Sequence, residues 1–222
     1  MKLLKTISLV IATALATTLS AQAAIVQTDA WNAAGGAWNP ANQPTYNAKN
    51  GGILNPDALS DNGADLYVSP FNIAAPPFFT NYGTGLYSDY FYTFFSLPTF
   101  TVSTSNVLDG VEKITFNLVS TALLSNPSVS LTYNGSLGAD WFDSIVVGFD
   151  SNFNVDIVSY TWTWDIGSLP PESAFSLGWA APSAHGVFYS VTLTQSVPEP
   201  SSLALITLGA AALYFKRRRS AV

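Results

Sequence analysis

Apolar and polar residues alternate with a period of two over several stretches of this 222-residue chain. The clearest stretch is 158–165, and the same alternation appears at 114–118, 129–133 and 187–193. Period-two alternation is typical of a strand that buries one face. We therefore predict half-buried strands at these four places. The residues expected on their buried faces are Ile114, Phe116, Leu118, Val129, Leu131, Tyr133, Val158, Tyr160, Trp162, Trp164, Val187, Tyr189, Val191 and Leu193.

Turn-forming residues separate these stretches and predict where strands end. No period of 3.6, which would indicate a helix, is visible between residues 24 and 197. Residues 66–197 are therefore expected to form an all-β domain, an antiparallel β-sandwich of jelly-roll type. Residues 24–65 are rich in Asn, Gly, Ala and Pro, which predicts a loop-rich N-terminal part with one short strand near Ile25 and Val26. The expected breaks are Pro98, Asp109-Gly110, Asn126-Pro127, Asn134-Gly135, Gly148 and Pro170-Pro171.

One segment, residues 86–97, departs from the alternation because large apolar or aromatic groups occupy both of its strand faces. Such a run is typical of a strand in the core whose two faces are both covered. We therefore predict a single core strand here.

The N-terminal segment 1–23 has the order of a secretory signal. Lys2 and Lys5 precede a mostly apolar run, and Ala21-Gln22-Ala23 offers the small residues that signal peptidase accepts. The sequence therefore predicts a signal helix that is cleaved after Ala23. An uncleaved membrane anchor and an ordinary buried helix are the alternatives.

The C-terminal segment 198–222 has an order of its own. Pro198-Glu199-Pro200 precedes an apolar run at 203–215, and Lys216, Arg217, Arg218 and Arg219 follow at once. An apolar run ended by basic residues is a stop-transfer signal whose basic side stays in the cytoplasm. Thirteen helical residues span about 20 Å, which is less than the ~30 Å hydrocarbon core. A helix of this length suits transient rather than permanent anchoring in the membrane. The alternative is an amphipathic helix docked on the domain.

Tripeptide, apolar helix and Arg-rich end together resemble the PEP-CTERM sorting signal of exported bacterial proteins. The resemblance implies a protein held briefly in the inner membrane of a Gram-negative bacterium until an exosortase removes the tail. It further implies a final place at the cell surface or in the extracellular matrix, where exopolysaccharide and biofilm are the associated partners. Tyr87, Asp89 and Phe91 resemble the FxDxF pattern of one subgroup, with Tyr in the place of the first Phe.

The formal net charge of −6 is the sum over segments whose charges differ in sign. Between residues 24 and 197 only Lys49 and Lys113 remain against 13 acidic residues, a net charge of −11. This charge argues against nucleic acid as a partner and against the binding of acidic polysaccharide through basic side chains. It favours neutral glycans or cations as partners. With no cysteine in the chain, disulfides and thiolate metal sites are excluded.

Calcium is the one cofactor that the residues suggest. Asp150, Asn152, Asn154 and Asp156 place oxygen side chains at alternate positions, as the start of an EF-hand loop does. Val155 stands where that loop has glycine, and Thr161 where it has glutamate. In a turn these oxygens could bind Ca²⁺, whereas on a strand edge they would face water. A second oxygen-rich stretch, 57–65, is open to the same two interpretations.

Catalytic groups are sparse. His185 is the only histidine and no Gly-x-Ser-x-Gly elbow accompanies it. Asp140 and Asp143 flank two aromatic residues, as glycosidase acids could, but surface aspartates are the favoured interpretation. We therefore name no catalytic residue and expect a non-catalytic surface or matrix protein. The alternatives are a carbohydrate-binding module using exposed Trp or Tyr rings and a secreted hydrolase that uses a carboxylate pair.

Overall fold

The computed structural model describes residues 23–32, 52–54, 63–69, 85–87, 90–93, 98–121, 128–180 and 186–198. The chain divides into two compact units, and one of them, Ile25–Ser196, holds the two sheets. The other unit is Met1–Ala24 with Val197–Val222. In the described part, no helix is long and apolar enough to cross a membrane. The predicted membrane helix 203–215 lies outside the described residues, as does all of the predicted signal segment except the start of the first strand.

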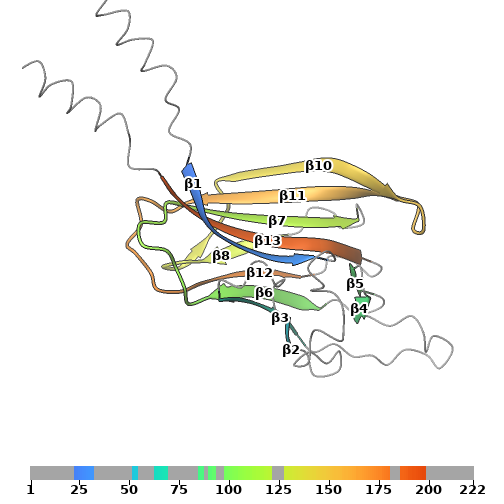
Figure 1. Cartoon of the computed structure of the whole chain (residues 1–222), viewed down its shortest axis with the longest axis horizontal. Coiled ribbons are helices and arrows are strands. Elements are labelled where there is room, and N and C mark those ends of the chain that lie inside the picture. Colours follow the sequence, from blue (N-terminus) through green and yellow to red (C-terminus); the bar gives the residue numbers. More distant parts are fainter. Residues whose placement is uncertain are drawn as a thin grey trace, which may run out of the picture. The chain divides into compact units, whose positions relative to one another are not determined.

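In the part of the chain that the structure describes, thirteen strands form two antiparallel sheets (Figure 1). The first sheet has the order β10 (Trp141–Asp150), β11 (Val155–Asp165), β7 (Lys113–Thr121), β13 (Gly186–Pro198), β5 (Tyr90–Thr93) and β4 (Gly85–Tyr87), and β1 (Ala23–Asn32) also pairs with β13. The second sheet has the order β2 (Gly52–Leu54), β3 (Ala64–Val68), β6 (Thr99–Thr104), β12 (Phe175–Ala180), β8 (Ser130–Thr132) and β9 (Ser136–Leu137). The all-β class and the antiparallel pairing are confirmed, and the jelly-roll strand order stays a prediction.

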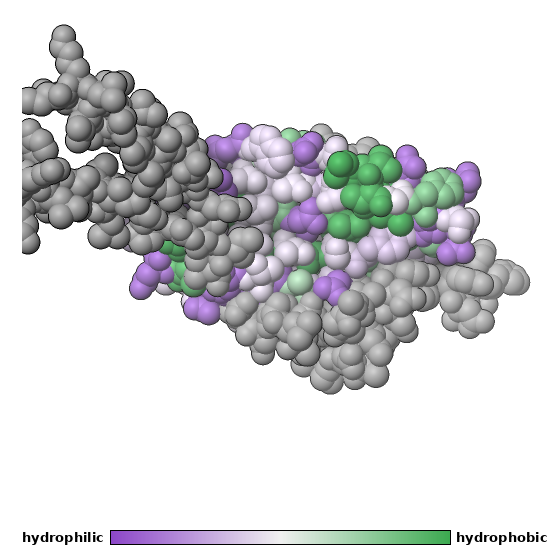
Figure 2. Space-filling model, turned by 45° about the horizontal axis from the view of Figure 1, so that its top comes forward, coloured by the Kyte–Doolittle hydropathy of each residue, from purple (hydrophilic) through white to green (hydrophobic). Residues whose placement is uncertain are grey.

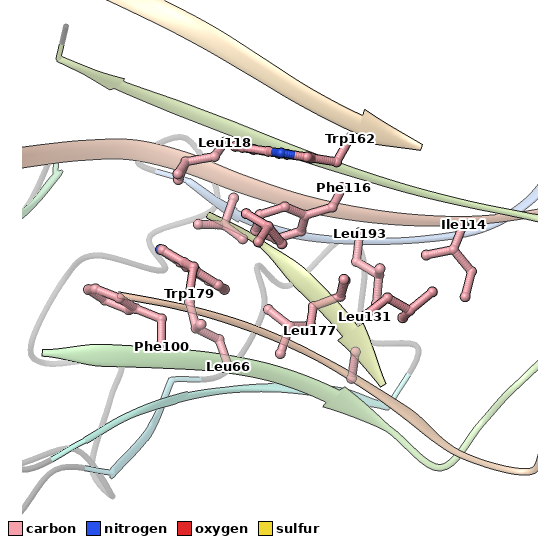
Figure 3. Packing of buried hydrophobic residues seen from close by; sticks show 14 of the residues in the cluster. Leu66, Phe100, Ile114, Phe116, Leu118, Leu131, Trp162, Leu177, Trp179 and Leu193 are labelled. Carbon is pink, nitrogen blue, oxygen red and sulfur yellow. The ribbon is translucent and has the colours of Figure 1, made fainter. Parts of the chain in front are cut away.

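Aromatic side chains from both sheets meet in one core (Figure 3). Phe116 of β7 lies 5.0 Å from Trp179 of β12 between ring centroids, and Phe100 of β6 lies 4.9 Å from Phe188 of β13. The alternation predicted for 114–118 and 158–164 is confirmed, because each expected inward residue there is at most 8 % exposed. Two layers that each bury one face thus explain the period of two along the chain.

Two β-bulges correct the sequence predictions. In β13 the register with β7 shifts between Phe188 and Ser190, so Phe188 is buried while Tyr189 is only half-buried, contrary to the predicted face. In β10 the register with β11 shifts between Val146 and Gly148. The strand break predicted at Gly148 is therefore wrong. A bulge inserts one extra residue, which reverses the alternation without ending the strand.

The single core strand predicted over 86–97 is also wrong. β4 ends at Tyr87, β5 begins at Tyr90, and the two pair with each other as antiparallel strands. Phe91 of β5 is fully buried, with its ring 5.4 Å from that of Phe100 and 6.3 Å from that of Phe188. The apolar run therefore contains two short strands that pair with each other, and not one long strand.

The N-terminal part contributes more to the sandwich than its composition predicted. The short strand expected near Ile25 is the ten-residue strand β1. Trp31 of this strand is fully buried, and its indole Nε1–H donates a hydrogen bond of 2.8 Å to the carbonyl oxygen of Leu54 in β2. A buried indole with a satisfied N–H links the two strands despite the loop-forming residues between them.

Candidate functional site

The end of β13 is hydrogen-bonded into the fold as far as Ser196, two residues before the predicted sorting signal. Gln195 is fully buried, its Oε1 accepts a hydrogen bond from Leu108 N at 3.1 Å, and its Nε2 donates to Asn106 O at 3.1 Å. The carbonyl oxygen of Ser196 accepts from Glu112 N at 3.1 Å. Pro198 is the last residue of β13, whereas Glu199, Pro200 and the basic cluster 216–219 lie outside the described residues.

The strand that follows the predicted signal segment pairs with this last strand. β1 pairs with β13, and the hydroxyl oxygens of Thr28 and Thr194 lie 3.4 Å apart. Figure 1 shows that β1 begins at the end of the sheet where β13 ends. Ala23 is the first residue of β1, and Ala21 lies outside the described residues. The two predicted processing junctions therefore border paired strands.

A row of polar side chains crosses the outer face of the second sheet. Asp65 of β3 pairs with Ser103 of β6, Ser103 with Ser176 of β12, and Ser176 with Thr132 of β8. We call these four residues the hydroxyl row. Their partners on the inner face are buried apolar residues, which forces the row outward. The row lines an open depression of about 440 Å³.

The next row of the same face adds an aromatic ring. Tyr67 pairs with Thr101, and Thr101 pairs with Gly178. Tyr67 is 39 % exposed. A Cβ at Gly178 would meet nothing nearer than a backbone oxygen at 4.0 Å, so the face is open there. Hydroxyls, one carboxylate and an exposed ring are groups that can hydrogen-bond a sugar and cover its apolar face.

The candidate calcium ligands lie at the turn of the β10–β11 hairpin. Residues 151–154 form a turn between β10 and β11. Asp150 Oδ1 accepts hydrogen bonds from the backbone N–H groups of Asn152 (2.8 Å) and Phe153 (3.3 Å), and its Oδ2 accepts one from the hydroxyl of Tyr189. Asn154 takes a left-handed conformation (φ 52°), and Asp156 is an exposed residue of β11. Both oxygens of Asp150 are thus used to cap the turn.

Metal-ligating groups do not cluster elsewhere in what the structure describes. No group of three His, Cys, Asp or Glu side chains that could hold a metal ion occurs among residues 23–198 outside the gaps. Of the second oxygen-rich stretch, 57–65, only residues 63–65 are described, and Asp65 belongs to the hydroxyl row.

Asp140 and Asp143, the candidate hydrolase acids, accept hydrogen bonds from backbone N–H groups at the surface. Asp140 Oδ2 accepts a hydrogen bond from Asp165 N at 2.7 Å, and Asp143 Oδ1 accepts one from Ser144 N at 2.8 Å. Both side chains are exposed. His185 and Asp89 lie outside the described residues, as does the side chain of Tyr87.

Sequence reasoning missed the exposed apolar strand β10. The only signal in the sequence is that apolar residues follow one another directly, in Trp141-Phe142 and in Ile145-Val146-Val147, so that both strand faces carry them. Five of these side chains and Phe149 are exposed in the structure.

Comparison with known proteins bears on the C-terminal end. Residues 196–219 match the PEP-CTERM protein-sorting motif, and this range includes Pro198-Glu199-Pro200 and the basic cluster 216–219. No curated protein and no solved structure matches the chain. The FxDxF pattern at Tyr87, Asp89 and Phe91 stays a prediction. The matched motif indicates an exported protein that is sorted by an exosortase-type enzyme.

Proposed function

We propose that this protein is a non-catalytic component of the cell surface or extracellular matrix of a Gram-negative bacterium, with the sandwich as the exported cargo. The observation that carries the proposal is the junction at Ser196. The fold is hydrogen-bonded through this residue, and the sorting motif begins at the same residue. Because no linker separates them, the sandwich is what remains once the tail is removed, and it is built to function outside the cell.

The chemistry of the described surface supports a role without catalysis. The aspartates of the β10–β11 hairpin and its base cap backbone N–H groups. A hydrolase that uses two carboxylates needs them to face one substrate across a cleft. In these strands the carboxylates support the fold instead. The net charge of −11 between residues 24 and 197 keeps such a domain soluble and repels anionic polymers.

Truncation tests the sorting part of the proposal. Full-length chain and a chain ending at Val197 are expressed in a Gram-negative host with an exosortase, and the membrane and soluble fractions are compared. The full chain should pass through the membrane fraction as a larger precursor, and the truncated chain should appear in the soluble fraction directly. A matched variant, Glu199→Ala with Pro200→Ala, keeps the apolar run and basic end and should accumulate as uncleaved membrane precursor. Unchanged fractionation of the truncation would contradict the proposal.

A second function is favoured by the hydroxyl row. We propose that the outer face of the second sheet binds a neutral glycan, with the Tyr67 ring against a sugar face and Asp65, Ser103 and Ser176 hydrogen-bonded to sugar hydroxyls. Serine and threonine hydroxyls both donate and accept, which suits a partner made of hydroxyls. The single carboxylate of the row accepts hydrogen bonds from sugar hydroxyls and disfavours acidic sugars.

Glycan-array binding of the purified protein, with and without EDTA, tests this second function. Tyr67→Ala should weaken binding about tenfold, in line with the loss of roughly 1.4 kcal/mol for one aromatic contact. Ser168→Ala changes an exposed turn residue outside the hydroxyl row and outside β10, and should leave binding unchanged. Loss of binding in EDTA would support Ca²⁺ as a participant. No binding in either condition would refute the glycan proposal and leave the sorting proposal standing.

A further inference from the structure

Exposed apolar side chains gather on one strand of the sandwich. Eight large hydrophobic residues are exposed in the described part of the chain, and six of them belong to β10. Figure 2 shows a compact hydrophobic patch on this side of the molecule. The six are Trp141, Phe142, Ile145, Val146, Val147 and Phe149, with exposed fractions between 39 and 63 %. A concentration of this kind marks an interaction surface more often than chance exposure.

β10 is also an edge of its sheet. Among the described strands it pairs with β11 alone, so the backbone groups along its other side are open to a further strand. Natural edge strands are usually protected by Lys, Pro or a bulge placed to interrupt pairing. β10 contains no Lys and no Pro, its one charged side chain between Trp141 and Val146 is Asp143, and its bulge at 146–148 leaves this stretch regular. This edge is therefore suited to pairing.

The patch covers both faces of β10, which decides the kind of partner. Phe142 lies opposite Trp162, on the face of the buried core residues. Trp141 lies opposite the half-buried Thr163, on the outer face. A helix or a flat surface would cover only one of these faces. An added strand covers both, because its own side chains alternate across the sheet.

We propose that the added strand is β10 of a second copy of this chain, paired antiparallel about Ser144. In this register Phe142 lies opposite the second copy's Val146, and Trp141 lies opposite Val147 within the second copy's bulge. Each apolar pair occurs twice by symmetry. Asp143 lies opposite the second copy's Ile145, so no carboxylate is placed directly opposite another. The two-fold contact is closed and continues the sheet from one copy into the other.

The available area is sufficient for a stable dimer. Each of the six side chains offers ~100 Å² of exposed surface, about half of what a large apolar side chain can bury. Five of the six lie within the paired stretch 141–147, so two copies would bury up to about 1,000 Å², the size at which specific interfaces begin. The charge of −11 on residues 24–197 opposes association at long range. Since salt screens that repulsion, the dimer should become stronger as ionic strength rises.

A chain without cysteine allows a direct test by cross-linking. In the Ser144→Cys variant, the two introduced cysteines would lie directly opposite each other with Cα atoms ~4.5–5.5 Å apart, within the range that a disulfide spans. The full chain is expressed in a Gram-negative host, where the periplasm is oxidising. Non-reducing gels should show a covalent dimer at least tenfold more abundant than in Ser168→Cys, a control at an exposed turn.

Two further variants test the register and the interface. Asp143→Cys and Ile145→Cys should cross-link efficiently when the two are co-expressed and poorly when either is expressed alone. Val146→Lys in the Ser144→Cys background should reduce the covalent dimer at least tenfold, whereas Ser168→Lys should not, and circular dichroism verifies that both fold. Equal cross-linking of the Ser144→Cys and Ser168→Cys variants would overturn the proposal. So would a monomer mass for the wild type in sedimentation, or cross-linking to a different protein.

Discussion

The clamp formed by Gln195 at the end of β13 allows a quantitative test of the junction. Its carboxamide bonds both to the N–H of Leu108 and to the carbonyl of Asn106, in the loop between β6 and β7. The side chain is fully buried, whereas Leu108 is half-buried and Asn106 is exposed, so the two bonds are partly shielded from water. Gln195→Leu keeps the approximate size of the side chain and removes both polar groups.

The expected loss of stability follows from these two contacts. Each partly buried backbone group that loses its partner costs ~1–3 kcal/mol. Leucine regains about 2 kcal/mol through its greater apolar burial. The net fall in the free energy of unfolding is therefore about 2 kcal/mol, or roughly 4–8 °C in Tm for a domain of this size.

Urea unfolding followed by tryptophan fluorescence measures this difference, because the core contains several of the six tryptophans. Thr192→Val is the matched control, since Thr192 lies half-buried on the other face of the same strand. It should change the free energy of unfolding by less than about 0.5 kcal/mol. If Gln195→Leu unfolds at the wild-type urea midpoint, the clamp contributes nothing and the reasoning is refuted.

Three other changes test separate parts of the fold. Burial raises the pKa of Tyr160 above its ordinary 10.0, so the folded state resists ionisation of this side chain and the free energy of unfolding should fall as pH rises above 10. Tyr160→Phe should make the decline in the urea midpoint between pH 9 and 11 shallower. An equal decline in wild type and variant contradicts this. Gly135→Ala should cost about 1 kcal/mol in thermal unfolding through its φ of 115°, whereas Gly138→Ala, with equally open space around it, should cost little. Tyr189→Phe removes the hydroxyl that donates to Asp150 and should speed proteolysis of the β10–β11 hairpin; an unchanged cleavage rate would show that the bond does not hold the turn.

The strands that the sequence predicts best are those with one regular buried face. β7 and β11 pair with each other without a bulge, so their alternation runs unbroken from end to end. In β13 the residues Val187, Phe188 and Tyr189 are all apolar or aromatic, so the pattern does not show where a bulge falls among them. The bulge in the pairing with β7 buries Phe188 and leaves Tyr189 half-buried. Local pattern therefore predicts that a strand exists and leaves its register to its neighbours.

The candidate glycan site could not be predicted in the same way. Asp65, Ser103, Thr132 and Ser176 come from four strands, and no spacing in the sequence relates them. Each is an ordinary polar position when taken alone, because half-buried strands carry such residues throughout. The row exists only through the strand order β3-β6-β12-β8. By contrast, the sorting signal is a linear sequence motif, so the sequence predicts it without any knowledge of the fold.

The two proposed surfaces can act together because they belong to different sheets. The hydroxyl row lies on the outer face of the second sheet, and β10 is an edge of the first. Pairing through β10 would therefore leave both glycan faces open and place two of them in one particle. A pair of linked sites binds a polymer more tightly than one site does, since the second contact forms at a high effective concentration. The domain, which has only two lysines between residues 24 and 197, would in this way bind a neutral matrix through two copies of a weak site.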